Sequence, residues 1–120
     1  MYLKSHKELI VWQKSILLVK EIYRLTSQFP KDEIYGLSSQ MRRSAVSIPS
    51  NIAEGYSRKS TKDYAHFLRI AYGSSTELET QIIIAKDLYK NIDYSTTELL
   101  LEEVLKILNV ITEKLESKNN

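Results

Sequence analysis

The segment over residues 36–55 constrains the fold of this chain more than any other stretch. At 100° per residue, its apolar residues and those flanking it fall in one helical stripe: Ile34, Met41, Ala45, Ile48, Ile52 and Tyr56. The opposite side carries mostly short polar groups in place of the long charged side chains of a water-facing helix: Ser39, Arg43, Ser47, Ser50, Glu54 and Ser57. Short side chains let another helix come close. We therefore expect packing on two sides, one within the subunit and one against a neighbour.

Composition indicates a single domain without cysteine chemistry. The 120 residues form one predicted domain over 1–120, and the absence of cysteine excludes disulfides, thiolate metal sites and a thiol nucleophile. The N-terminus lacks the apolar stretch of a signal peptide, and charged residues interrupt every apolar run well short of the ~20 residues that a membrane span needs. We expect a cytoplasmic protein with no membrane partner.

Four helices are predicted, over residues 6–29, 33–57, 61–91 and 96–116. Ser5, Ser60 and Ser95 are the expected N-caps of the first, third and fourth helices, because each serine precedes a helical pattern. Pro49 removes one N–H inside the second helix, so we expect a kink there with compensation by serine, but not two helices. Four amphipathic helices with short connections predict an all-α, up-down-up-down antiparallel four-helix bundle.

A second set of residues predicts a ring-shaped homo-oligomer. A monomeric bundle needs only one apolar stripe on each helix, yet Ile70 and Ile84 lie on the far side of the third helix. Gly73 lies on that side and costs ~1 kcal/mol relative to alanine, which suggests a tight approach. The simpler interpretation is that such apolar residues only widen the buried face. The candidate subunit-interface residues on the second and third helices are Ser47, Ser50, Asn51, Glu54, Ile70, Gly73, Glu77, Thr80 and Ile84.

No arrangement of residues predicts a catalytic, metal or cofactor site. Around His66, Lys62, Arg69 and Ile70 occupy positions at helical spacing where a second metal ligand would stand. The three glycines are isolated, so the chain lacks the loop that cradles phosphates. We expect that the protein is not an enzyme.

The charge distribution offers one candidate for nucleic-acid binding. Residues 1–70 contain twelve Lys and Arg against six Asp and Glu, whereas residues 71–120 contain five against nine. The candidate phosphate-binding residues are Arg42, Arg43, Arg58, Lys59, Lys62 and Arg69, with Tyr56 and Tyr64 near enough in sequence to stack on bases. Two alternatives remain open: the charges solvate a surface, or they pair with the acidic part of the chain or a neighbour.

Several longer motifs resemble those of one bacterial family. They are the segment 36–55 together with Trp12-Gln13-Lys14-Ser15, Phe29-Pro30, Glu33-Ile34-Tyr35-Gly36-Leu37, Phe67-Leu68-Arg69-Ile70-Ala71 and Gly73-Ser74-Ser75-Thr76-Glu77-Leu78-Glu79-Thr80-Gln81. Over about residues 9–115, the chain resembles the bacterial four-helix-bundle family, also called the 23S rRNA intervening-sequence (S23) proteins.

The resemblance implies a four-helix bundle that assembles as a homopentamer, and it brings no catalytic residues. The chain is similar also to the accessory protein of diversity-generating retroelements, a pentamer that binds nucleic acid and a reverse transcriptase. These likenesses imply a non-enzymatic scaffold whose partners are structured RNA or DNA, or a nucleoprotein component such as a reverse transcriptase. The alternative is a protein–protein interaction module with no direct nucleic-acid binding.

Overall fold

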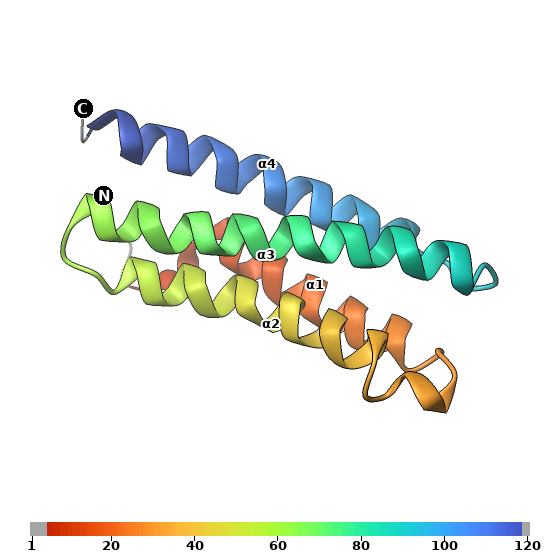
Figure 1. Cartoon of the computed structure of the whole chain (residues 1–120). Helices are drawn as coiled ribbons and strands as arrows, with labels where there is room; N and C mark the ends of the chain where they lie inside the picture. Colours follow the sequence, from red (N-terminus) through yellow and green to blue (C-terminus); the bar gives the residue numbers. More distant parts are fainter. Residues whose placement is uncertain (1–4, 119–120) are drawn as a thin grey trace.

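The structure is a computed structural model that describes residues 5–118, and these residues form four α-helices and no strand. The helices are α1 (Ile10–Thr26), α2 (Leu37–Tyr56), α3 (Thr61–Leu88) and α4 (Ser95–Lys118). Successive helices lie lengthwise and are connected at alternate ends of an elongated molecule of 46 × 26 × 24 Å (Figure 1). Helices α1 and α3 each lie beside both α2 and α4. None of these helices combines the length and apolar character needed to cross a membrane.

The core lies along the axis of the bundle and contains the predicted stripes. In α2, the side chains of Met41, Ala45, Ile48 and Ile52 have no solvent exposure. The prediction is wrong for Ile34, which is 56% exposed because α2 begins three residues after it. The other helices add their own fully buried aliphatic residues, among them Leu18, Ile22, Leu25, Leu68, Leu78, Val104 and Leu108. Burial of such side chains is the main favourable term that holds the four helices together.

The first two helices are shorter than the sequence suggested, because turns occupy their ends. A 3₁₀ turn over His6–Glu8 precedes α1, and the Ser5 hydroxyl accepts the Lys7 N–H within this turn instead of capping the α-helix. Another 3₁₀ turn, Lys31–Glu33, precedes α2. The carboxylate of Glu33 accepts the Leu37 N–H at 3.3 Å, so Glu33 stabilises the start of α2 from outside the helix.

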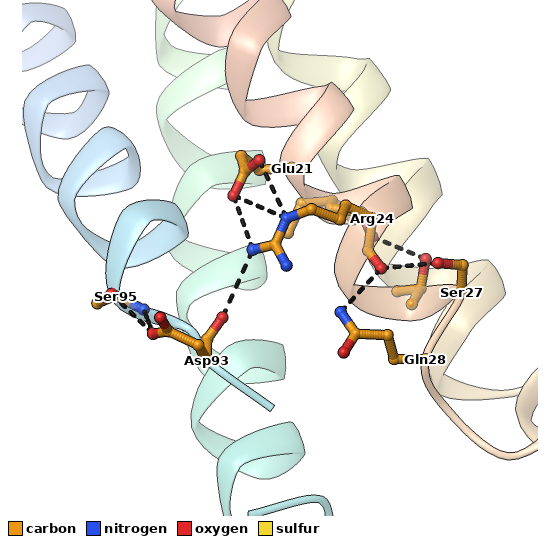
Figure 2. Close-up of polar contacts among 8 residues, drawn as sticks. Glu21, Arg24, Ser27, Gln28, Asp93 and Ser95 are labelled. Atoms are coloured by element: carbon orange, nitrogen blue, oxygen red, sulfur yellow. Dashed lines mark hydrogen bonds and ion pairs between the residues drawn. The ribbon is translucent and has the colours of Figure 1, made fainter. Parts of the chain in front are cut away.

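Side-chain hydrogen bonds fix the start of α3 and the connection between α3 and α4. Ser60 is the N-cap of α3, as predicted, and its hydroxyl accepts the Asp63 N–H at 3.0 Å. Ser95 is not a cap: it is the first residue of α4, and its N–H and hydroxyl both donate to the Asp93 carboxylate (Figure 2). These bonds lower the pKa of Asp93. At the end of α3, the Tyr94 hydroxyl donates to the Ala85 carbonyl at 3.1 Å.

Helix α2 continues through Pro49 as one helix, in agreement with the phase of its apolar stripe. Neighbouring polar side chains bind backbone carbonyls around the proline. The Ser50 hydroxyl donates to the Val46 carbonyl, and the Asn51 amide donates to the Ser47 carbonyl, each at 2.8 Å. Pro49 itself is buried against the rest of the bundle.

Candidate interaction surfaces

The short polar residues of α2 meet α3 inside the subunit. Ser44 donates a hydrogen bond to the Glu77 carboxylate at 2.6 Å, and the hydroxyls of Ser47 and Ser74 lie 2.8 Å apart. The Asn51 amide also donates to the Ser47 hydroxyl, at 2.9 Å. Three of the candidate subunit-interface residues, Ser47, Asn51 and Glu77, therefore belong to the polar contacts where α2 meets α3 within the chain.

Gly55 explains how α2 and α3 come close near their connection. A Cβ at Gly55 would lie 2.8 Å from the Cβ of Phe67 and 3.1 Å from the ring of Tyr64. The first of these distances is shorter than two carbon atoms can approach and the second is tight, so any larger residue would require the neighbouring part of α3 to shift. Gly55 lies inside α2 and is buried.

The remaining subunit-interface candidates lie on an exposed face of α2 and α3. They are Ser50, Glu54, Ile70, Gly73, Thr80 and Ile84. Ile70 and Ile84 are 39% and 44% exposed. A Cβ at Gly73 would meet nothing within 4 Å, so the tight approach expected at this glycine is not made within the chain. We call Ile70, Gly73 and Ile84 the outer face of α3.

Three of the six basic candidates already have partners in the chain. The Arg42 guanidinium lies 4.5 Å from the centre of the Tyr23 ring and donates to the Thr26 hydroxyl. The other two arginines are paired with carboxylates. Arg58 forms an ion pair of 3.0 Å with Glu54, and Arg69 forms two hydrogen bonds, of 2.9 and 2.6 Å, with Glu116. These three side chains are therefore less available to phosphates than their sequence context suggested.

The basic candidates do not gather in a single patch. Arg42 and Arg43 lie near the start of α2, about 20 Å along the helix from its end at Tyr56, whereas Lys59 and Lys62 lie at the connection to α3. Arg43, Lys59 and Lys62 are exposed. Tyr56 and Tyr64 pack edge to face with ring centres 5.8 Å apart, so these two rings contact each other instead of extending together into solvent.

The bond between Arg69 and Glu116 joins α3 to α4 and alters the protonation of both groups. Hydrogen bonding to the Arg69 guanidinium lowers the pKa of Glu116, and the same bond raises the pKa of Arg69. A second pair, Lys86 and Glu98 at 2.9 Å, joins the same two helices nearer to their connection. The two pairs clamp α3 and α4 at separate levels of the bundle.

A further polar cluster joins α1 to the connection between α3 and α4 (Figure 2). Arg24 binds the carboxylate of Glu21, at 2.9 Å for its closest contact, and donates to the Asp93 carbonyl at 3.5 Å. The hydrogen bond to Glu21 raises the pKa of Arg24. All these contacts lie within one subunit, so we assign the cluster a structural role.

The two histidines pack against aromatic rings. His6 lies edge to face with Trp12, and His66 with Phe67, at ring-centre distances of 5.1 and 5.4 Å. Over residues 5–118, no three His, Cys, Asp or Glu side chains lie together in a way that would hold a metal ion.

Two surface grooves were not identified from the sequence. One lies between α1 and α2, has a volume of about 300 Å³ and is mainly apolar, with Trp12, Ile16, Val19 and Val46 among its lining residues. The other, which we call the α3–α4 groove, has a volume of about 370 Å³ and is lined by Glu79, Ile82, Ile83, Glu98, Leu101, Glu102, Leu105 and Lys106. The apolar, exposed Ile83 was the available sequence signal, but its acidic neighbours on α4 are brought to it only by folding.

Comparison with known proteins gives a family and a fold. The family model described as 23S rRNA-intervening sequence protein matches residues 7–112. No curated protein matches the chain significantly. The chain is similar to a solved structure from Bacteroides thetaiotaomicron, described as a protein of unknown function from the S23 ribosomal protein family. The likeness has a TM-score of 0.63 at 24% identity and covers 90% of this chain and 96% of the other, which supports the fold. Because the family model spans most of its length, this chain belongs to the 23S rRNA-intervening sequence protein family.

Proposed function

We propose that this protein is a non-enzymatic, oligomeric scaffold that associates with structured RNA. The observation that carries the proposal is membership of a family named for the 23S rRNA intervening sequence, over residues 7–112. Two exposed cations, Lys59 and Lys62, support it because they stand at the end of the bundle where α2 and α3 are connected (Figure 1). Cationic side chains of this kind neutralise phosphates irrespective of base sequence.

Assembly would make such a small basic site effective. Two lysines in one subunit provide few phosphate contacts, but a ring repeats the pair in every subunit and thereby gains avidity without new kinds of contact. The exposed Ile70 and Ile84 of the outer face of α3, together with the uncontacted Gly73, support assembly through this face. By resemblance to its family, the expected ring is a homopentamer in the cytoplasm.

The test is an electrophoretic shift assay with 23S rRNA fragments at increasing salt, using the double variant Lys59→Glu/Lys62→Glu. The paired Arg58 is left intact so that its contact with Glu54 is preserved. We expect the variant to lose RNA retention at low salt, or to show a log–log salt dependence shallower by roughly 1.5 for each engaged subunit.

The matched control is Lys31→Glu/Lys90→Glu, which makes the same change in charge at the opposite end of the bundle (Figure 1). This control should bind RNA nearly as the unmodified protein does. Equal loss in both double variants would mean that net charge alone governs retention, and equal binding by all three proteins would exclude the site at Lys59 and Lys62.

A second candidate function is a protein–protein interaction module without direct RNA binding. It is favoured by one observation: Arg42, Arg58 and Arg69 are already engaged by aromatic or acidic partners within the chain. This alternative predicts no salt-dependent retention of any rRNA fragment by the unmodified protein.

A further inference from the structure

The α3–α4 groove has an apolar base. Ile82 and Leu101, which line it, are only 2% and 3% exposed, whereas Ile83 beside them is 58% exposed. Leu105 adds a partly buried apolar side chain from α4. Because a solvent-facing isoleucine adjoins a depression with an aliphatic base, further apolar side chains can be buried here without rearrangement of the helices.

The rim of the groove is acidic. Three carboxylates line it, from Glu79 on α3 and from Glu98 and Glu102 on α4, against one cation, Lys106. Glu98 pairs with Lys86 and Glu102 with Lys106, and no ion pair to Glu79 is seen among residues 5–118. The lysines and carboxylates of both pairs are well exposed, and such surface pairs are each worth only about 0–1 kcal/mol. A cation on a partner can therefore replace either lysine at little cost.

The groove is already formed in the chain without a partner. The ion pairs Arg69–Glu116 and Lys86–Glu98 join α3 to α4 at two levels. Arg69 and Lys86 are seventeen residues apart on α3, which corresponds to about 25 Å of helix. The lining of the groove on α4 runs from Glu98 to Lys106, about 12 Å of helix, which matches about two turns of a third helix lying along it. A preformed groove reduces the cost of ordering on binding.

We propose that the α3–α4 groove binds a cationic amphipathic helix of a partner protein. The apolar ridge of that helix packs on Ile82, Ile83 and Leu105, while its Lys or Arg side chains contact the three rim carboxylates. A nucleic acid does not fit this surface, because its phosphates would face Glu79, Glu98 and Glu102. The groove shares no residue with the site at Lys59 and Lys62, so this inference stands apart from the RNA proposal.

The groove and the outer face of α3 lie on different sides of the helix. Ile83 and Ile84 are consecutive and therefore point about 100° apart around the α3 axis. A partner helix in the groove can thus bind while Ile70, Gly73 and Ile84 contact a neighbouring subunit. The proposal predicts that the groove stays open to the partner in the assembled protein.

The test uses a fluorescein-labelled 18-residue peptide of leucine and lysine, in which leucines recur every three or four residues so that the two residue types form opposite faces of a helix. Fluorescence anisotropy with the full-length protein should show saturable binding that weakens as salt rises. The variant Ile83→Asp should weaken binding at least tenfold, and Glu79→Gln/Glu102→Gln should weaken it several-fold and reduce its salt dependence. A peptide with glutamate in place of every lysine should not bind.

The control variant is Leu99→Asp, which places the same charge at another exposed aliphatic residue of this helix pair, 60% exposed on α4 but not part of the groove. It should bind the peptide as the unmodified protein does, and circular dichroism should show native helix content for all variants. Equal binding by Ile83→Asp and the unmodified protein would overturn the proposal. So would a change in the sedimentation of the protein alone on Ile83→Asp, because the groove would then be covered by a second copy. RNA retention by Ile83→Asp should be unchanged.

Discussion

Two glycines of this protein have opposite environments, although both lie in helix interiors. Any side chain at Gly55 would collide with Phe67 and Tyr64, so this glycine is required for the close packing of α2 against α3. Gly73 faces open space within the subunit. Compared with alanine, this glycine destabilises α3 by about 0.5–1 kcal/mol, and no contact within the subunit offsets the cost. Only at Gly55, therefore, does packing within the subunit require a glycine.

This difference predicts opposite effects of one substitution at the two sites. Gly55→Ala should lower the free energy of unfolding by about 1–3 kcal/mol, because the new Cβ overlaps the Cβ of Phe67. Gly73→Ala should leave the stability of the subunit unchanged or raise it by up to about 1 kcal/mol. Urea unfolding of both variants, at concentrations where the subunit is monomeric, measures these changes. Equal destabilisation by the two would contradict the assigned environments.

At the scale of elements, the starts of α2 and α4 depend on side chains that are outside the helix they stabilise. Glu33 binds the start of α2 and also accepts the Tyr89 hydroxyl, which raises the pKa of Tyr89 to about 12. Asp93 binds the start of α4. Local sequence predicted the correct cap only at Ser60, where cap and helix are contiguous and no distant residue intervenes.

The clamp between Arg69 and Glu116 predicts a pH dependence of stability. The native pKa of Glu116 is lowered from 4.5, so the unfolded chain binds this proton more readily than the native protein does. The contribution of the clamp is therefore fully present above about pH 5 and is lost as pH falls through the lowered native pKa. Glu116→Gln should be less stable than the unmodified protein at pH 7, and the difference should shrink as the pH falls through the lowered native pKa of Glu116.

Urea midpoints of both proteins across this pH range measure the effect, and Glu79→Gln is the control. Because both side chains of the clamp are exposed, the shift in midpoint should be small. Glu79→Gln should show no comparable difference from the unmodified protein at pH 7. A Glu116→Gln curve parallel to that of the unmodified protein at every pH would exclude the clamp as the cause.

For the whole molecule, the outer face of α3 is the apolar surface that the subunit leaves exposed for assembly in the proposed ring. Ile70 and Ile84 are exposed on either side of Gly73, where a second helix can approach the backbone without meeting a side chain. Closed rings form when such a surface meets a different surface of an identical subunit at an angle that closes. Self-association through this face also underlies the proposed avidity for RNA.

Sedimentation velocity and light scattering at micromolar concentration test the assembly. The unmodified protein should have a mass that is a multiple of 13.9 kDa, with five copies as the expectation from the family resemblance. Ile70→Asp/Ile84→Asp should dissociate the assembly into folded monomers, whereas Val110→Asp, at an exposed residue of α4, should not. A monomeric unmodified protein would exclude the ring and, with it, the gain in avidity.

The sequence by itself determined the class of fold. Apolar periodicity is a local property, so the α-helical stripes of Met41, Ala45, Ile48 and Ile52, and the continuity of α2 through Pro49, could be read directly. The same spacing placed Ile70 and Ile84 away from the core. The helical spacing could not predict that α1 ends at Thr26 and α3 at Leu88, because turns and distant side chains compete there with the helical pattern.

Only the tertiary structure decided which polar groups are free to bind a partner. Arg69 binds Glu116, which is 47 positions away in the sequence, and Ser44 binds Glu77, which is 33 positions away. Such pairs depend on which helix lies beside which face, and that is set by packing of the whole bundle. For the same reason the acidic α3–α4 groove was invisible in the sequence: its carboxylates are near in space but come from helices whose pairing no local pattern encodes.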